Sequence, residues 1–96
     1  MNKNSTTIKA KVGETFSVEV YSRKVSGYRW FVQYDPSAVR FISSNTVPNE
    51  QGWGASGTEV FKFSTKFKGE FEFKLVLKRP WEDIVIDEHP ILVLAE

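Results

Sequence analysis

The chain has 96 residues, of which 41% are hydrophobic and 15% are aromatic, and its thirteen basic and twelve acidic residues leave a net charge of +1. One domain is expected at this length, and because there is no cysteine, disulfide scaffolds, thiolate zinc sites and a cysteine nucleophile are excluded. The balanced charge creates no long-range field for nucleic acid or an anionic membrane, so we expect neither as a partner.

The start of the chain is polar. Residues 1–5 are expected to fray, and they lack the apolar centre of a signal peptide. No apolar run approaches the ~18 residues that a membrane-spanning helix needs. We therefore expect a cytoplasmic protein that is a monomer when free, with a lysosomal or secreted location as the alternative if a leader has been removed.

Seven segments alternate apolar and polar residues, which is the pattern of β-strands. They cover residues 6–12, 15–21, 28–34, 39–42, 58–65, 71–77 and 91–94. No segment repeats apolar residues at helical spacing over ten residues, and Asp35-Pro36 predicts only one turn of helix at 35–38. The pattern predicts a single all-β domain over residues 1–96, an immunoglobulin-like antiparallel β-sandwich of seven to eight strands without a disulfide.

The stretch from Val25 to Trp30 joins a turn to a strand. Ser26 and Gly27 precede the aromatic strand, and glycine accepts positive φ without steric penalty, so a sharp turn is expected there. Tyr28 and Trp30 then alternate with polar residues. We interpret Trp30 as a core anchor, as in many such sandwiches, and the turn as a working tip.

The connections differ in length. Short ones are predicted at Gly13-Glu14, 35–38 and 67–70, and longer ones at 22–27, 44–57 and 79–90. Because consecutive antiparallel strands run in opposite directions, alternate connections emerge at the same end. The three long connections should therefore share one end of the sandwich, and we interpret that end as a binding face.

The residues give little support for a catalytic function. His89 is the sole histidine, and no nucleophile elbow accompanies it, so a surface or core role is favoured over a serine–histidine–acid triad. The carboxylates at Glu82, Asp83, Asp87 and Glu88 do not match a calcium loop, and a solvated acidic loop is favoured. We expect no metal and no cofactor.

Two of the long connections carry residues suited to recognition. The glycines around Trp53 precede a strand rather than a helix, so a phosphate-binding loop is disfavoured. Either the loop is simply flexible, or its small residues allow close approach to a partner.

The motif Arg79-Pro80-Trp81 joins two residue types that are enriched at binding hot spots. Trp81 is either a cap on the core or an exposed anchor, and we favour the anchor.

Three motifs stand in order on the three long connections: Ser26-Gly27-Tyr28-x-Trp30, Gly54-Ala55-Ser56-Gly57-Thr58-Glu59 and Arg79-Pro80-Trp81. Together they resemble the chagasin family of cysteine-protease inhibitors, whose loops read Asn-Pro-Thr-Thr-Gly-Tyr/Phe, Gly-x-Gly-Gly and Arg-Pro-Trp/Phe. This chain departs from the family in the first two loops. Arg23-Lys24 replaces Asn-Pro, Val25 and Ser26 replace the two threonines, and Ser56 replaces a glycine.

The resemblance implies tight, reversible, non-covalent inhibition of papain-like (cathepsin-type) cysteine proteases, without enzyme activity. The loops at 22–28, 44–57 and 79–90 would occlude the active-site cleft, with the first of them over the catalytic cysteine. The residues implied in protease binding are Val25, Ser26, Gly27, Tyr28, Trp53, Gly54, Ala55, Ser56, Gly57, Arg79, Pro80 and Trp81. The alternative is a generic immunoglobulin-like binding module for carbohydrate or protein that uses the same aromatic tips, and a small hydrolase is a weaker rival.

Overall fold

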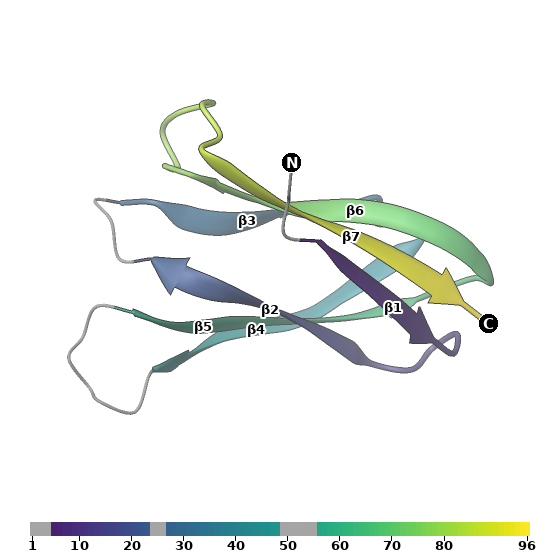
Figure 1. The fold of residues 1–96 in the computed structure, drawn as a ribbon. Helices are drawn as coiled ribbons and strands as arrows, with labels where there is room; N and C mark the ends of the chain where they lie inside the picture. The colour runs from purple at the N-terminus through teal and green to yellow at the C-terminus, as the bar shows by residue number, and fades with distance from the viewer. Residues whose placement is uncertain (1–4, 24–26, 49–55) are drawn as a thin grey trace.

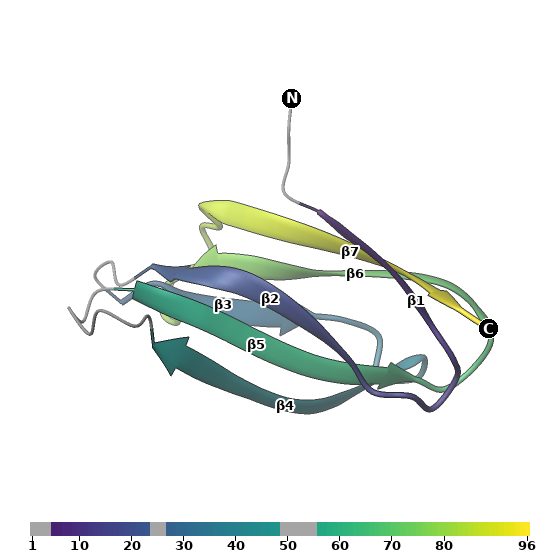
Figure 2. The same cartoon turned by 60° about the horizontal axis from the view of Figure 1, so that its bottom comes forward.

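The architecture is a two-layered β-sandwich. A computed structural model describes residues 5–23, 27–48 and 56–96. Within them the strands are β1 (Thr6–Ala10), β2 (Phe16–Arg23), β3 (Arg29–Gln33), β4 (Val39–Pro48), β5 (Ser56–Thr65), β6 (Gly69–Lys78) and β7 (Asp87–Ala95). One sheet has the order β1-β7-β6-β3 and the other β2-β5-β4. Figure 1 and, in a turned view, Figure 2 show these two sheets stacked on each other.

The core lies between the sheets because alternate residues of each strand point inward. Phe73, Leu75 and Leu77 of β6 are buried in this way. Phe63 of β5 is fully buried, and its ring lies 4.8 Å from that of Phe73 in the opposite sheet, in an edge-on arrangement. The rings of Phe16, Tyr34 and Phe41 also surround Phe63. Edge-on aromatic contacts stabilise a core beyond the area they bury, and the contact between Phe63 and Phe73 joins the two layers.

The predicted fold class is confirmed, with one pairing that the sequence did not indicate. Within the described residues, four of the five strand pairs are antiparallel, whereas β1 runs parallel to β7. The parallel register matches Thr6 with Ile91 and Ala10 with Ala95. The parallel arrangement is possible because β1 and β7 are the first and last strands, so no tight turn has to join them.

Strand β4 is much longer than predicted. The predicted strand ended at Ile42, whereas β4 continues to Pro48. A β-bulge between Phe41 and Ser43 shifts the pairing with β5 at that point, and a bulge breaks the alternation that marks a strand in the sequence. Beyond it the pairing continues through polar residues, where the Thr46 hydroxyl donates to the Glu59 carboxylate at 2.8 Å.

Strand β7 also begins earlier than predicted, at Asp87 rather than Ile91. Asp87 to Pro90 pair with Leu77 to Lys74 of β6, whereas the pairing with β1 begins only at Ile91. Pro90 is compatible with this position because β1 does not pair with it, and proline is tolerated where one side of a strand carries no partner.

A single turn is present at 35–38. The amides of Ala38 and Val39 both donate to the carbonyl of Asp35 at 3.0 Å. The Asp35 carboxylate accepts hydrogen bonds from the amide and hydroxyl of Ser37, and these bonds hold the pKa of Asp35 below its usual value. These residues form a hydrogen-bonded turn rather than the predicted turn of helix, and no helix forms in the described part of the chain.

The strand ends confirm the prediction of one shared end for the longer connections. Figure 1 shows that β2, β4 and β6 finish, and β3, β5 and β7 begin, at the left of the molecule. The turns after β1, β3 and β5 lie at the opposite end. The segment from Arg79 to Ile86 between β6 and β7 is the longest described connection at the shared end.

Candidate functional site

Gly27 and Trp81 meet at the shared end of the sandwich. Gly27 has a φ of +82°, the left-handed conformation predicted for it. A Cβ atom added at Gly27 would lie only 2.8 Å from Cη2 of the Trp81 indole. Trp81 therefore packs directly against a backbone that only glycine leaves open, and the contact joins the β2–β3 and β6–β7 connections.

Arg79 links the aromatic residues of this contact. Its guanidinium carbon lies 4.6 Å from the ring centroid of Tyr28 and 5.9 Å from that of Trp81. Its Nη1 also forms an ion pair of 3.3 Å with Glu82, and both side chains are about one-third exposed. A guanidinium can stack on aromatic rings while its edge binds a carboxylate. Arg79 therefore fixes the positions of Tyr28 and of the segment that carries Trp81.

A tight turn presents Trp81 to solvent. The Glu82 amide donates to the Arg79 carbonyl at 3.1 Å, which makes Arg79 to Glu82 a four-residue turn. Pro80 occupies the second position, where its fixed φ is favoured. Trp81 follows it and is 71% exposed. The prediction that Trp81 is an exposed anchor rather than a cap on the core is consistent with this exposure.

The structure brings together only part of the predicted set of protease-binding residues. Gly27, Tyr28, Arg79, Pro80 and Trp81 form one continuous group. Gly57 is buried in β5, next to Ser56 at the start of that strand. The remaining predicted residues, Val25, Ser26, Trp53, Gly54 and Ala55, lie outside the described residues. The structure therefore supplies geometry for the first and third motifs.

Glu82 belongs to this group, although the sequence pattern predicted that it lies in a solvated acidic loop. Its carboxylate pairs with Arg79, and its amide closes the turn. The spacing of the two residues was a usable signal, because a cation and an anion on either side of a Pro-Trp pair become neighbours once that pair forms a turn. Of the other acidic residues, Glu88 pairs with Lys74 at 3.2 Å.

Trp30 is half-buried, which is consistent with the predicted anchoring role although the residue is not fully inside the core. It packs against the core cluster, and its indole Nε1 donates to the carbonyl of Tyr21 at 3.0 Å. This bond joins β3 in one sheet to β2 in the other. Trp30 and Trp81 thus have opposite placements, one tying the layers together and the other standing at the surface.

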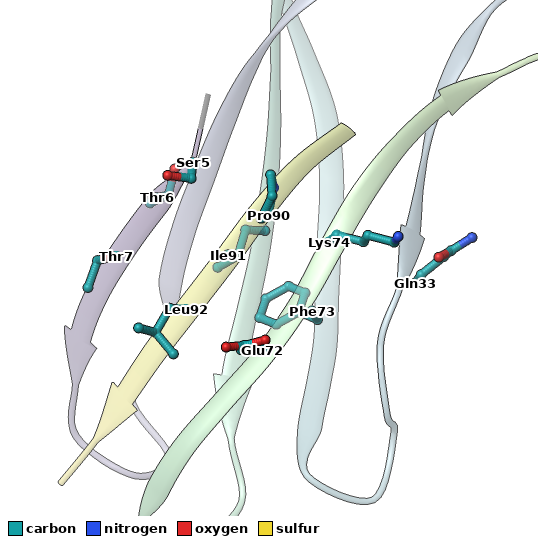
Figure 3. A pocket seen from close by; sticks show the side chains of 10 residues that line it. All are labelled: Ser5, Thr6, Thr7, Gln33, Glu72, Phe73, Lys74, Pro90, Ile91 and Leu92. Carbon is teal, nitrogen blue, oxygen red and sulfur yellow. The ribbon is translucent and has the colours of Figure 1, made fainter. Parts of the chain in front are cut away.

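One hollow lies away from this end, across the strands of the four-stranded sheet (Figure 3). It measures about 550 Å³ and is lined by residues such as Leu92, Glu72, Lys74 and Gln33. Figure 3 shows Glu72 and Lys74 as neighbours along β6, without a converging set of polar groups. A hollow of this kind lacks the few convergent polar groups typical of a ligand site, so we assign the function to the loop end.

His89 has a structural environment. Its Nε2 and the Thr6 hydroxyl share a hydrogen bond of 2.6 Å, which links β7 to β1. Burial lowers the pKa of His89, and the Asp87 carboxylate opposes this shift. The described residues contain no cluster of acidic and histidine side chains able to hold a metal ion, and none of the described segments forms a helix that could cross a membrane.

Comparison with known proteins gives one family and several related folds. The model of the chagasin family of peptidase inhibitors, I42, matches residues 9–94. Chagasin from Trypanosoma cruzi is 29% identical over 84 residues, which cover 81% of this chain and 76% of chagasin.

Two solved structures share the fold. The cysteine protease inhibitor EhICP2 from Entamoeba histolytica superimposes with a TM-score of 0.79 at 16% identity, over 98% of this chain and 88% of that protein. Amebosin superimposes with a TM-score of 0.73 at 22% identity, over 99% of this chain and all of that protein. Since the family model spans nearly all of the sequence, the protein belongs to the chagasin family of peptidase inhibitors and is an inhibitor rather than an enzyme.

Proposed function

We propose that this protein inhibits papain-like cysteine peptidases reversibly and without covalent reaction, by inserting the loop end of the sandwich into the active-site cleft. The peptidase is its macromolecular partner, and the inhibitor acts as a monomer without a cofactor. The Gly27 turn enters the cleft, and the connections from β4 to β5 and from β6 to β7 contact either side of it.

One observation carries the proposal: the exposed Trp81 is held in place before any partner binds. Its indole packs on Gly27, and Arg79 stacks between it and Tyr28. Tryptophan and arginine are enriched at binding hot spots. An exposed tryptophan that is already fixed loses little rotational freedom on docking, which favours affinity.

Inhibition without cleavage follows from the geometry that proteolysis requires. A thiolate attacks a carbonyl held in line at roughly 3–3.5 Å. A loop that fills the site with its carbonyls in another orientation excludes substrate and stays intact. The left-handed turn at Gly27 differs from the extended backbone of a cleavable substrate, so it suits a blocking role.

The choice of a cysteine peptidase rests on the related proteins. EhICP2 is described as a cysteine protease inhibitor, and family membership covers residues 9–94 of this chain. The family therefore favours peptidase inhibition over a generic carbohydrate- or protein-binding module built on the same aromatic tips.

The test is titration of a papain-like enzyme of known active-site concentration. We expect activity to fall linearly to zero at one inhibitor per active site, and to return on dilution with the inhibitor still intact by mass. A serine protease assayed in parallel should keep its activity. Unchanged papain-like activity at micromolar inhibitor would contradict the proposal, and cleavage of the inhibitor at the Gly27 turn would show that it is a substrate.

A further inference from the structure

Lys78 is the last residue of β6 and lies outside the motif that follows it. Its side chain points to the outer face of the sheet, because Leu75 and Leu77 face the core. Its Nζ donates to the Glu82 carbonyl at 2.9 Å and sits 5.1 Å from the ring centroid of Phe31 in β3. Lys78 thus connects the outer face of the sheet to the turn that carries Trp81.

Glu82 is held from three directions. Lys78 binds its carbonyl, Arg79 pairs with its carboxylate at 3.3 Å, and the Arg79 carbonyl accepts its amide at 3.1 Å. At the other end of the connection the Ile86 amide donates to the Leu77 carbonyl at 2.9 Å. Of these interactions, the Lys78 bond is the one that ties the turn to a side chain over the body of the sheet.

This connection depends on such polar ties, together with the contacts of Trp81 with Gly27 and Arg79, because its apolar residues face solvent. Trp81 and Ile84 are 71% and 66% exposed, so packing into the core does not order them. The outer face of the sheet beside Lys78 is nevertheless shielded from solvent. Val76, which pairs with Phe31 on the outward-facing side, is only 1% exposed. A cation over an aromatic ring at such a partly desolvated place interacts more strongly than on an open surface.

We propose that Lys78 is a positioning residue for inhibition, whose ammonium, seated over Phe31, fixes the Glu82 carbonyl and keeps the Trp81 turn in its binding conformation. The proposal rests on the proposed function. Without this tie a smaller fraction of molecules presents Trp81 correctly, and the apparent dissociation constant rises by the inverse of that fraction. The loss falls on the association rate, because the complex itself is unchanged once the turn is in place.

The first test uses the free protein and amide hydrogen exchange. Lys78→Met keeps the aliphatic stem over the sheet and removes the charge and the donor. We expect exchange of the Glu82 and Ile86 amides to accelerate on the order of tenfold, while the Leu75 amide is unaffected. Lys78→Arg should restore slow exchange, because a guanidinium can also stack on Phe31 and donate to a carbonyl.

Lys74→Met is the matched control. Lys74 lies on the same strand and the same face, and its partner is Glu88 rather than the turn. Slow exchange of the Glu82 amide is expected in this variant. Unchanged exchange in Lys78→Met, or equal acceleration in Lys74→Met, would overturn the positioning role.

The second test measures inhibition of the papain-like enzyme. Lys78→Met should bind on the order of tenfold more weakly, with the change in the association rate. Lys78→Arg and Lys74→Met should bind as the natural protein does. Faster exchange with full affinity, or a loss confined to the dissociation rate, would also overturn the inference. If the natural protein fails to inhibit, the proposed function fails, and the exchange comparison still decides whether Lys78 holds the turn.

Discussion

At the scale of single residues, Trp81 is where the structure predicts function most directly. Its indole is 71% exposed and contacts the Gly27 backbone rather than the core. Trp81→Ala should weaken peptidase binding by about 2–4 kcal/mol, as truncation of an interface hot spot does. Urea unfolding should change little. A large loss of stability in this variant would show that Trp81 supports the fold.

Gly27 offers a second prediction at this scale, with a control built into the chain. Gly27 and Gly13 both have positive φ, at +82° and +84°. An alanine in the left-handed conformation costs roughly 1–2 kcal/mol at either position. At Gly27 the new Cβ also meets Trp81 at 2.8 Å, whereas at Gly13 nothing lies within 4 Å.

Gly27→Ala and Gly13→Ala should therefore lose similar stability, while only Gly27→Ala weakens inhibition, because the exposed indole has to move. Urea unfolding and inhibitor titration of both variants measure the two effects separately. Equal inhibition by the two variants would show that the Gly27–Trp81 contact is irrelevant to binding.

At the scale of elements, Trp30 shows what a structural tryptophan does in this fold. Its Nε1 donates to the Tyr21 carbonyl and so links β3 to β2 in the other sheet. Trp30→Phe keeps an aromatic ring and removes the donor, so we expect a loss of about 1 kcal/mol in unfolding free energy. Inhibition should be unchanged. Reduced affinity at normal stability would place Trp30 in the binding site instead.

The elements also show how far the sequence could lead. Strands whose inner residues are large and apolar, such as β6, were predicted because alternation reports burial on one face. The second half of β4 and the start of β7 were missed because their pairing runs through polar residues and Pro90. Their backbone hydrogen bonds depend on the neighbouring strand, which a local pattern does not contain.

The same distinction applies to the candidate site. Positive φ at Gly27 and the exposure of Trp81 were predicted from local chemistry. Their mutual contact and the stacking of Arg79 on Tyr28 were not. Those contacts join segments far apart in the sequence and depend on the register of β3 and β6, which sets Arg29 opposite Lys78.

At the scale of the whole molecule, no disulfide holds the sandwich together. The edge at which β1 pairs with β7 therefore depends on weak non-covalent bonds. One of them is the hydrogen bond between Thr6 and His89, which supports the pairing of β1 with β7. Burial lowers the pKa of His89 in the folded state, and Asp87 acts in the opposite direction. Glu19 and Glu88 line the same hollow as His89 and Asp87.

This arrangement predicts how stability changes with pH. Because the folded-state pKa of His89 is lower than its unfolded value, the unfolded chain binds the proton more tightly. The contribution of neutral His89 is fully present above the unfolded pKa of about 6.5. It is lost as the pH falls from there through the folded pKa, and the protein should become less stable on acidification over that window.

His89→Gln keeps a polar side chain that does not titrate, so its unfolding free energy should fall less between about pH 7.5 and pH 5 than that of the natural protein. Urea unfolding at both pH values gives the comparison, and an identical decrease in the two proteins would assign the acid sensitivity to the carboxylates.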